Sequence, residues 1–185
     1  MFPVHKKGDK RNVANYRGIT SLCAGSKLLE ILVGDIIFSA SKSYTSPNQH
    51  GFFSGGSIDT NLDQFTSYCL KNIEKGDQID TVYTDLKAAF DRVDHRILIA
   101  KLDGLGAPSL LTRWLESYLV NLRLCVKLAA AKTDYFTNSS GVPQGSNLGP
   151  LLFSLFFNDI SRLLPPGASL VYADELKIYL IIRNT

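Results

Sequence analysis

The chain has 185 residues, of which 45% are hydrophobic, 20% are charged and 10% are aromatic. This composition is typical of a globular domain, and it excludes an intrinsically disordered chain, which would contain fewer aromatic and aliphatic residues. With 20 Lys and Arg against 17 Asp and Glu, the net charge of +3 is too small to indicate nucleic-acid binding, so any basic surface must be local.

Two helices are expected in the first half of the chain. Apolar side chains recur at helical spacing in residues 26–39 and again in residues 58–75. Gly76 follows the second pattern, at the position where a glycine commonly ends a helix. Residues 41–57 are rich in Ser and Gly and predict an irregular connection between the two helices.

Beyond the second helix the periodicity of the apolar residues changes. In residues 78–84 apolar and polar side chains alternate, and many are β-branched or aromatic, which predicts a strand. Helical patterns follow at 94–103 and 109–119. Apolar and polar side chains alternate again in residues 122–128, which predicts a second strand, and residues 134–138 are a candidate partner for it.

The last part of the chain predicts a helix followed by a hairpin. Residues 146–163 carry a broad apolar face, and Ser146 is the expected N-cap of this helix. Two apolar, β-prone runs follow at 168–173 and 176–182, and only the dipeptide Asp174–Glu175 separates them. Turn chemistry favours Asn-Gly or Asp-Gly at such a tip, so an acidic pair there is unusual.

Three carboxylates stand at the ends of predicted strands. Asp85 follows the strand at 78–84, and Asp174 and Glu175 lie at the tip of the hairpin. If these ends align in one sheet, the carboxylates converge and repel one another unless a cation neutralises them. Oxygen ligands of this kind suit Mg²⁺ or Mn²⁺, and two such ions can drive nucleotidyl transfer. The alternative is three unrelated surface acids on turns, and spacing alone does not decide between the two.

Sequence words around these acids resemble a known family. They read FPVHKKGD at 2–9, NYRGITSL at 15–22, YTDLKAAFDRVDH at 83–95, GVPQGSNLGPLLF at 141–153 and YADELKIY at 172–179. In this order they resemble the reverse transcriptase domain of non-LTR (LINE-type) retrotransposons of the jockey-like kind. The resemblance covers essentially the whole chain.

The resemblance implies an α+β fold: a truncated right-hand polymerase domain over residues 1–185, made of fingers and palm without a thumb. Residues 1–76 would be mainly fingers, and residues 77–185 mainly palm, with an antiparallel sheet flanked by helices. It also implies an RNA-directed DNA polymerase, a nucleotidyltransferase that uses two Mg²⁺ or Mn²⁺ ions. Its expected partners are an RNA template, a DNA primer, dNTPs and the thumb and endonuclease regions of a parent protein. No membrane is expected, and the location would be intracellular, in the nucleus or the cytoplasm.

The resemblance also assigns roles to residues near the acids. Asp85, Asp174 and Glu175 would be catalytic and, with the carbonyl of Leu86, would bind the metal ions. Phe90 would lie beneath the sugar of the incoming nucleotide and exclude a 2′-hydroxyl.

Five further residues match the family's contacts to nucleotide and template. Gln144 and Gly145 form the P-Q-G turn under the template base and the incoming nucleotide. Arg17 would bind the triphosphate, because a guanidinium suits phosphate oxygens. Lys6 and Lys7 would contact phosphates of the nucleotide or of the template backbone.

Three positions depart from the family pattern. Glu175 replaces the second aspartate, Gly56 replaces an arginine and Gly18 replaces a proline. These departures keep open a second interpretation, a catalytically inactive remnant with at most weak nucleic-acid binding.

Other enzyme classes are less compatible with the sequence. Phe90 and the P-Q-G turn argue against a nucleotide cyclase or an RNA-directed RNA polymerase. A Ser–His–Asp hydrolase has no support, because His5, His50 and His95 lie in no relevant motif and are expected at the surface or at helix caps.

Overall fold

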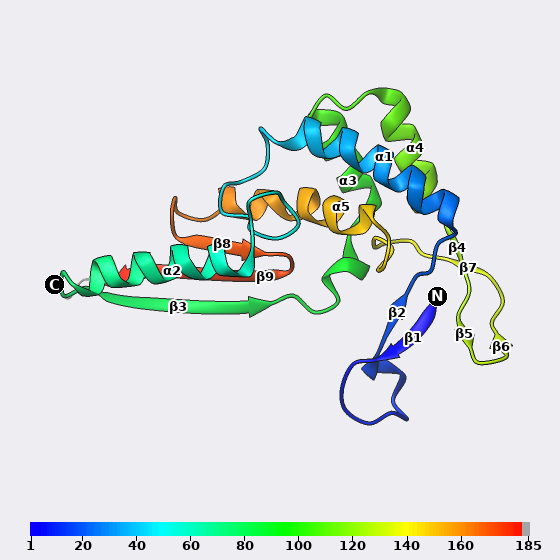
Figure 1. Ribbon diagram of the computed structural model, residues 1–185, viewed down its shortest axis with the longest axis horizontal. Helices are drawn as coiled ribbons and strands as arrows, with labels where there is room; N and C mark the ends of the chain where they lie inside the picture. Colours follow the sequence, from blue (N-terminus) through cyan, green and yellow to red (C-terminus); the bar gives the residue numbers. More distant parts are fainter. Residues whose placement is uncertain (183–185) are drawn as a thin grey trace. The chain divides into compact units, whose positions relative to one another are not determined.

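The computed structural model describes residues 1–182, which form two compact units (Figure 1). The first unit combines Met1–Lys42 with Phe90–Leu152. The second combines Ser43–Ala89 with the chain from Phe153 onward. Both contain helices and antiparallel strands, so the α+β class is confirmed, whereas the division into fingers and palm stays a prediction.

The first unit begins with a β-hairpin that the sequence did not predict. Strand β1 (Phe2–His5) pairs antiparallel with β2 (Tyr16–Ile19), and a short 3₁₀ helix, η1 (Val13–Asn15), lies in the connecting loop. At the base of the loop, the backbone N–H of Lys6 donates to the Asn15 carbonyl at 2.8 Å. Each strand is only four residues long, so a period of two is hard to detect.

Three helices of the first unit agree with the helical patterns in the sequence. They are α1 (Ala24–Ser41), α3 (His95–Gly104) and α4 (Ser109–Val120). Asp94 caps α3 by accepting the backbone N–H groups of Arg96 and Ile97. The buried apolar side chains of these helices, which contribute to the core, are Ile37, Leu98, Leu102, Leu115 and Leu119.

The strand predicted at 122–128 is interrupted. Its first part is β4 (Arg123–Leu124), which pairs with β7 (Phe136–Thr137), as the candidate pairing with 134–138 predicts. Its second part is β5 (Lys127–Leu128), which forms a separate hairpin with β6 (Ala131–Lys132). The two parts therefore pair with different partners, which sequence alternation cannot reveal.

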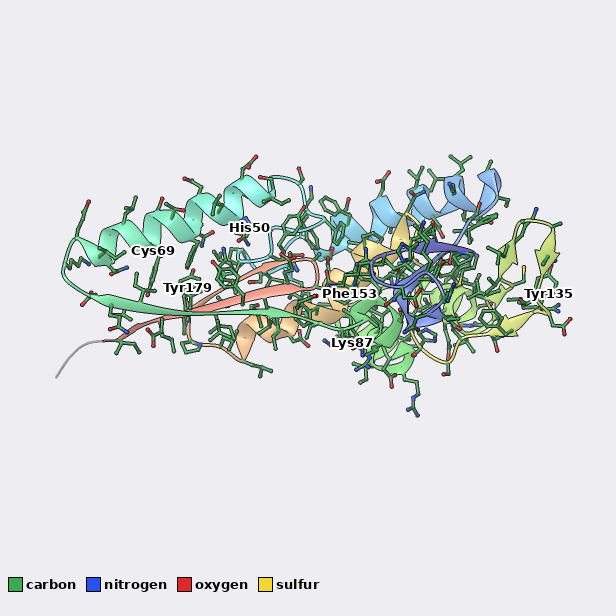
Figure 2. All side chains as sticks on the ribbon, turned by 90° about the horizontal axis from the view of Figure 1, so that it is seen from below. His50, Cys69, Lys87, Tyr135, Phe153 and Tyr179 are labelled. Atoms are coloured by element: carbon green, nitrogen blue, oxygen red, sulfur yellow. The ribbon has the colours of Figure 1, made fainter. Side chains whose placement is uncertain are left out.

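The second unit is built on a three-stranded antiparallel sheet in the order β3-β9-β8 (Figure 1). Its strands are β3 (Gln78–Asp85), β8 (Ser169–Tyr172) and β9 (Glu175–Ile182). Helix α2 (Ile58–Ile73) packs on this sheet, and Gly76 takes a positive φ of 83° just beyond its end. Figure 2 shows Tyr179 between the helix and the sheet, where its ring centroid lies 4.7 Å from that of Tyr68.

The helix predicted at 146–163 changes character along its length. It consists of α5 (Leu148–Phe157) followed by the 3₁₀ helix η3 (Asn158–Arg162). Ser146 accepts the Gly149 N–H at 2.8 Å, which agrees with its predicted capping role. At the transition, the Asn158 side chain accepts the Ser46 N–H at 2.8 Å, so a loop distant in sequence is tied to this point.

The tip of the C-terminal hairpin lies one residue earlier than predicted. Its two loop residues are Ala173 and Asp174, whereas Glu175 is the first residue of β9 and pairs with Tyr172. Ala173 has a positive φ of 55°, which the tight turns of two-residue hairpins require at their first loop position. Glu175 also faces Asp85 on the other side of β9, so pairing on two sides places it in the strand.

Across residues 1–182, none of the helices has the length and apolar character needed to cross a lipid bilayer.

Candidate active site

The second unit places two of the predicted acids directly opposite each other. Asp85 is the last residue of β3, Glu175 is the first residue of β9, and the two are register partners. Side chains of such a pair point to the same face, with Cβ atoms roughly 4.5–5.5 Å apart. Asp174 precedes Glu175 in the turn, so the strand ends carrying the three acids are aligned as the sequence argument required.

The surroundings of the pair leave its carboxylates available to a cation. Asp85 and Glu175 are both exposed, and within residues 1–182 no Lys, Arg or His nitrogen lies within 4.0 Å of either carboxylate. In the same range, no three Asp, Glu, His or Cys side chains are gathered tightly enough to hold a metal ion. The strand register thus pairs Asp85 with Glu175, and Asp174 directly precedes Glu175 in the chain. Leu86 follows Asp85 immediately beyond the strand.

A cavity of about 470 Å³ opens beside the acidic pair, within the second unit. Its walls combine Asp85 and Glu175 with apolar side chains of α2 and the sheet. Lys177, to which sequence reasoning gave no role, also lines it, and its Nζ lies 3.2 Å from the Asn61 side-chain oxygen and 4.3 Å from the Phe65 ring centroid. Burial lowers the pKa of this ammonium.

The first unit holds the predicted nucleotide-binding turn. Gly145 has a φ of 96°, and a Cβ built on it would lie 2.9 Å from the Thr20 carbonyl oxygen. The Thr20 N–H in turn donates to the Gln144 carbonyl at 2.7 Å, and the Gln144 carboxamide donates to Asp91 at 2.9 Å. Glycine at 145 therefore allows a close approach to the backbone after β2, a contact the sequence analysis did not foresee.

Phe90 belongs to the same unit and is tied to the same turn. It lies half-buried in a 3₁₀ helix, η2 (Ala89–Arg92), and its carbonyl accepts the Val142 N–H at 2.8 Å. This hydrogen bond and the one from Gln144 to Asp91 join residues 83–95 to residues 141–153, which are distant in sequence. No role is predicted for Asp91 from the sequence, although it directly follows Phe90 in residues 83–95.

The predicted basic contacts gather on the β1–β2 hairpin. Arg17 lies on β2 opposite Val4, and its side chain is exposed. Lys6 and Lys7 are exposed in the loop that follows β1. All three cations are thus free to contact a polyanion.

The histidines are expected at the surface or at helix caps. This is wrong for His50, which is buried in a loop, whereas His95 is buried as the first residue of α3, beside the N-cap Asp94. His50 is 7% exposed, and its ring nitrogens contact the side-chain oxygens of Thr60 and Gln64 at 2.8 and 3.1 Å. His95 is 6% exposed, and its Nε2 lies 2.7 Å from the Gly141 carbonyl oxygen. Their roles are structural, because these contacts engage the rings in packing between segments.

Comparison with known protein families assigns the chain to a family. The family model described as reverse transcriptase (RNA-dependent DNA polymerase) matches residues 4–183, almost the whole chain. The chain belongs to the reverse transcriptase family. The resemblance found in the sequence words is therefore confirmed.

Relatives from mobile elements support the same assignment. The probable RNA-directed DNA polymerase from transposon BS of Drosophila melanogaster is 31% identical over 96% of this chain and 21% of its own length. The RNA-directed DNA polymerase from mobile element jockey of Drosophila funebris is 28% identical over 90% of this chain and 19% of its own length. This reverse transcriptase domain thus spans about a fifth of the length of these relatives.

Solved telomerase structures share the fold. Apo telomerase from Candida tropicalis, truncated from its C-terminal domain, superposes with a TM-score of 0.63 at 13% identity, over 82% of this chain and 34% of the telomerase chain. Telomerase of the same organism in complex with the TWJ fragment of telomeric RNA gives a TM-score of 0.59 at 12% identity, over 84% and 28% of the two chains. At such identities the likeness concerns the fold alone.

Proposed function

We propose that this reverse transcriptase domain is the core of an RNA-directed DNA polymerase, which adds dNTPs to a primer 3′-hydroxyl on an RNA template. The observation that carries the proposal is the direct pairing of Asp85 with Glu175, beside Asp174, at one end of the β3-β9-β8 sheet. Exposed acids without an ion-pair partner at a strand end contribute little to folding. Two acids opposite each other repel unless a cation neutralises them, so this pair suits a bound cation.

The donor set fits divalent metal ions. Asp85, Asp174, Glu175 and the carbonyl of Leu86 offer only oxygen, the ligand that Mg²⁺ and Mn²⁺ favour. Two such ions, when bound, supply the Lewis acidity that activates a primer hydroxyl and neutralises a leaving pyrophosphate. The exposed side chains of Asp85 and Glu175 can change rotamer to bring their oxygens together.

The remaining site residues would recognise nucleotide and template. Phe90 would exclude a 2′-hydroxyl by steric contact with the sugar, and the Gln144–Gly145 turn would pack under the template base and the incoming nucleotide. Arg17 would bind the triphosphate through its paired N–H donors. Lys6 and Lys7 would contact phosphates, which is supported by their exposure on the same hairpin as Arg17.

The same proposal covers the place of the domain in a larger enzyme. Residues 1–76 would act mainly as fingers and residues 77–185 mainly as palm of a right-hand polymerase. A thumb and an endonuclease of the parent protein would help to hold primer and template. The reaction would take place inside the cell, in the nucleus or the cytoplasm.

Primer extension on poly(rA)/oligo(dT) with Mg²⁺ or Mn²⁺ tests the proposal. We expect incorporation of dTTP by the native chain and none by Asp85→Ala. Glu175→Asp should be more active by about 10²-fold, because the extra methylene of Glu shifts the carboxylate by ~1.5 Å and such sites tolerate ~0.5 Å. Equal and measurable incorporation by the native chain and Asp85→Ala would refute the assigned site.

The glutamate at 175 favours a second candidate, an inactive remnant with weak nucleic-acid binding. In that case the native chain and Glu175→Asp would both be silent in primer extension while folded by circular dichroism. Binding of RNA that weakens steeply between 50 and 200 mM salt would then identify a residual electrostatic interaction. Activity restored by Glu175→Asp alone would instead mean that one methylene disables an otherwise complete site.

A further inference from the structure

A fully buried glutamate in the first unit has no role in the reaction described so far. Glu30 lies in the interior of α1 and is 1% exposed. Its Oε1 accepts the hydroxyl proton of Tyr118 of α4 at 2.5 Å, and its Oε2 accepts the backbone N–H of Asn147 at 2.7 Å. Within residues 1–182, no cationic nitrogen lies within 4.0 Å of this carboxylate.

The site that surrounds Glu30 is suited to a negative charge. Asn147 immediately precedes α5, whose first N–H groups carry the positive end of the helix dipole. Burial and the hydrogen bond to Glu30 raise the pKa of the Tyr118 hydroxyl well above its usual range, so this group stays a donor. Two donors and a helix N-terminus therefore compensate the cost of burying the carboxylate.

The Asn147 contact ties Glu30 to the nucleotide-binding turn. Asn147 lies two residues after Gly145, so it fixes the C-terminal side of that turn. The N-terminal side is fixed by the Thr20 N–H on the Gln144 carbonyl and by the Gln144 carboxamide on Asp91. Of these anchors, Glu30 is the only buried charged side chain.

We propose that Glu30 is a positioning residue that holds the turn 143–147 in place for the incoming nucleotide, with Tyr118 orienting its carboxylate. The inference rests on the proposed polymerase function for its kinetic consequence. The consequence for the turn itself does not depend on that function. Loss of the Glu30 contact leaves the Asn147 side chain on the Lys27 carbonyl as a weaker tie at 3.2 Å, so the turn loosens and nucleotide binding weakens more than the chemical step does.

The first test measures the turn directly. Amide hydrogen exchange is followed by NMR in the native chain, in Glu30→Gln and in the control Glu116→Gln, which makes the same change on an exposed residue of α4. A neutral carboxamide is a weaker acceptor than a carboxylate, so the Asn147 amide should exchange about tenfold faster in Glu30→Gln. The amide of Thr20 should also exchange faster, and amides of α2 should not change. Unchanged exchange at Asn147 would overturn the inference.

The second test is kinetic. In primer extension, Glu30→Gln should raise the dNTP KM about tenfold while kcat stays within about threefold, and Glu116→Gln should change neither. A fall in kcat with an unchanged KM would overturn the inference, because it would indicate general loss of folded enzyme. If the native chain incorporates no dNTP, the proposed function fails, and the exchange measurement still decides on Glu30.

A milder variant covers the case in which Glu30→Gln does not fold. Tyr118→Phe removes one hydroxyl and leaves the Asn147 contact in place. It should raise exchange at Asn147 about threefold, because the carboxylate is less firmly oriented. Exchange equal to that of the native chain would contradict the orienting role of Tyr118 and, with Glu30→Gln unfolded, would overturn the proposal.

Discussion

Replacement of Gly145 by alanine is the sharpest test of how the predicted nucleotide-binding turn is built. The residue has a φ of 96°, where side chains other than glycine are strained. A Cβ there would lie 2.9 Å from the carbonyl oxygen of Thr20 and 3.0 Å from Cγ2 of Ile19. Thr20 cannot easily retreat, because its own N–H is bonded to the Gln144 carbonyl at 2.7 Å.

The expected loss of stability has two parts. The positive φ costs an alanine about 1–2 kcal/mol. Forcing a methyl group against the backbone adds about 1–2 kcal/mol, as overpacking does in protein cores. The free energy of unfolding should therefore fall by about 2–4 kcal/mol, and the melting temperature by about 6–12 °C for a chain of this size.

Gly106→Ala is the matched control, because it separates the two parts. Gly106 belongs to the same unit and has a φ of 79°, but a Cβ built on it meets nothing within 4 Å. In urea unfolding, the control should lose only the conformational part, about 1–2 kcal/mol. A Gly145→Ala variant no less stable than Gly106→Ala would refute the claim that the turn depends on close contact with Thr20.

Three further predictions concern other parts of the chain. Gly56→Arg, which restores the residue of the family pattern, should lower stability by about 2 kcal/mol in thermal melts. The reason is that a Cβ at this position would lie 2.5 Å from the His50 carbonyl oxygen. A rise in stability would contradict this prediction. The hydrogen bond from the Ile97 N–H is the main cause that lowers the pKa of Asp94 below its ordinary 3.8. The stabilising effect of the Asp94 carboxylate is therefore complete above pH 3.8 and is lost as the pH falls further. In urea unfolding midpoints measured against pH, Asp94→Asn should flatten this loss of stability in acid, and an unchanged profile would exclude Asp94 as its source. Phe90→Val should raise incorporation of rNTPs relative to dNTPs at least about tenfold in primer extension, and an unchanged ratio would remove Phe90 from sugar selection.

Helices could be predicted from the sequence because their signals are local. The expected ranges of α1, α2, α3 and α4 each agree with the structure within about two residues, since period, caps and glycines lie inside or beside each helix. The β1–β2 hairpin was missed, because short strands joined by a ten-residue loop carry no comparable pattern. The break between β4 and β5 cannot be predicted for a related reason, since it depends on the different strands, β7 and β6, with which the two parts pair.

The sequence motifs name the candidate residues of the site, whereas the register and the turn that place three of them come only from the structure. The sequence words identified Asp85, Asp174 and Glu175, yet the turn position was off by one residue. That position depends on Glu175 pairing with Asp85, which lies ninety residues away, and not on the turn sequence. The burial of His50 and His95 cannot be predicted from the sequence for a similar reason, because it depends on contacts with other segments of the chain.

The departure at Glu175 affects only one of the two groups of site residues. The acidic pair depends on the β3–β9 register, within the second unit. The predicted nucleotide-binding turn depends on hydrogen bonds to Thr20, Asp91 and Glu30, all within the first unit. Because these contacts are complete, a defect in metal binding caused by the longer side chain leaves the turn intact. Activity that returns in Glu175→Asp would therefore place the defect in the carboxylate site, whereas silence of both chains would place it outside this site.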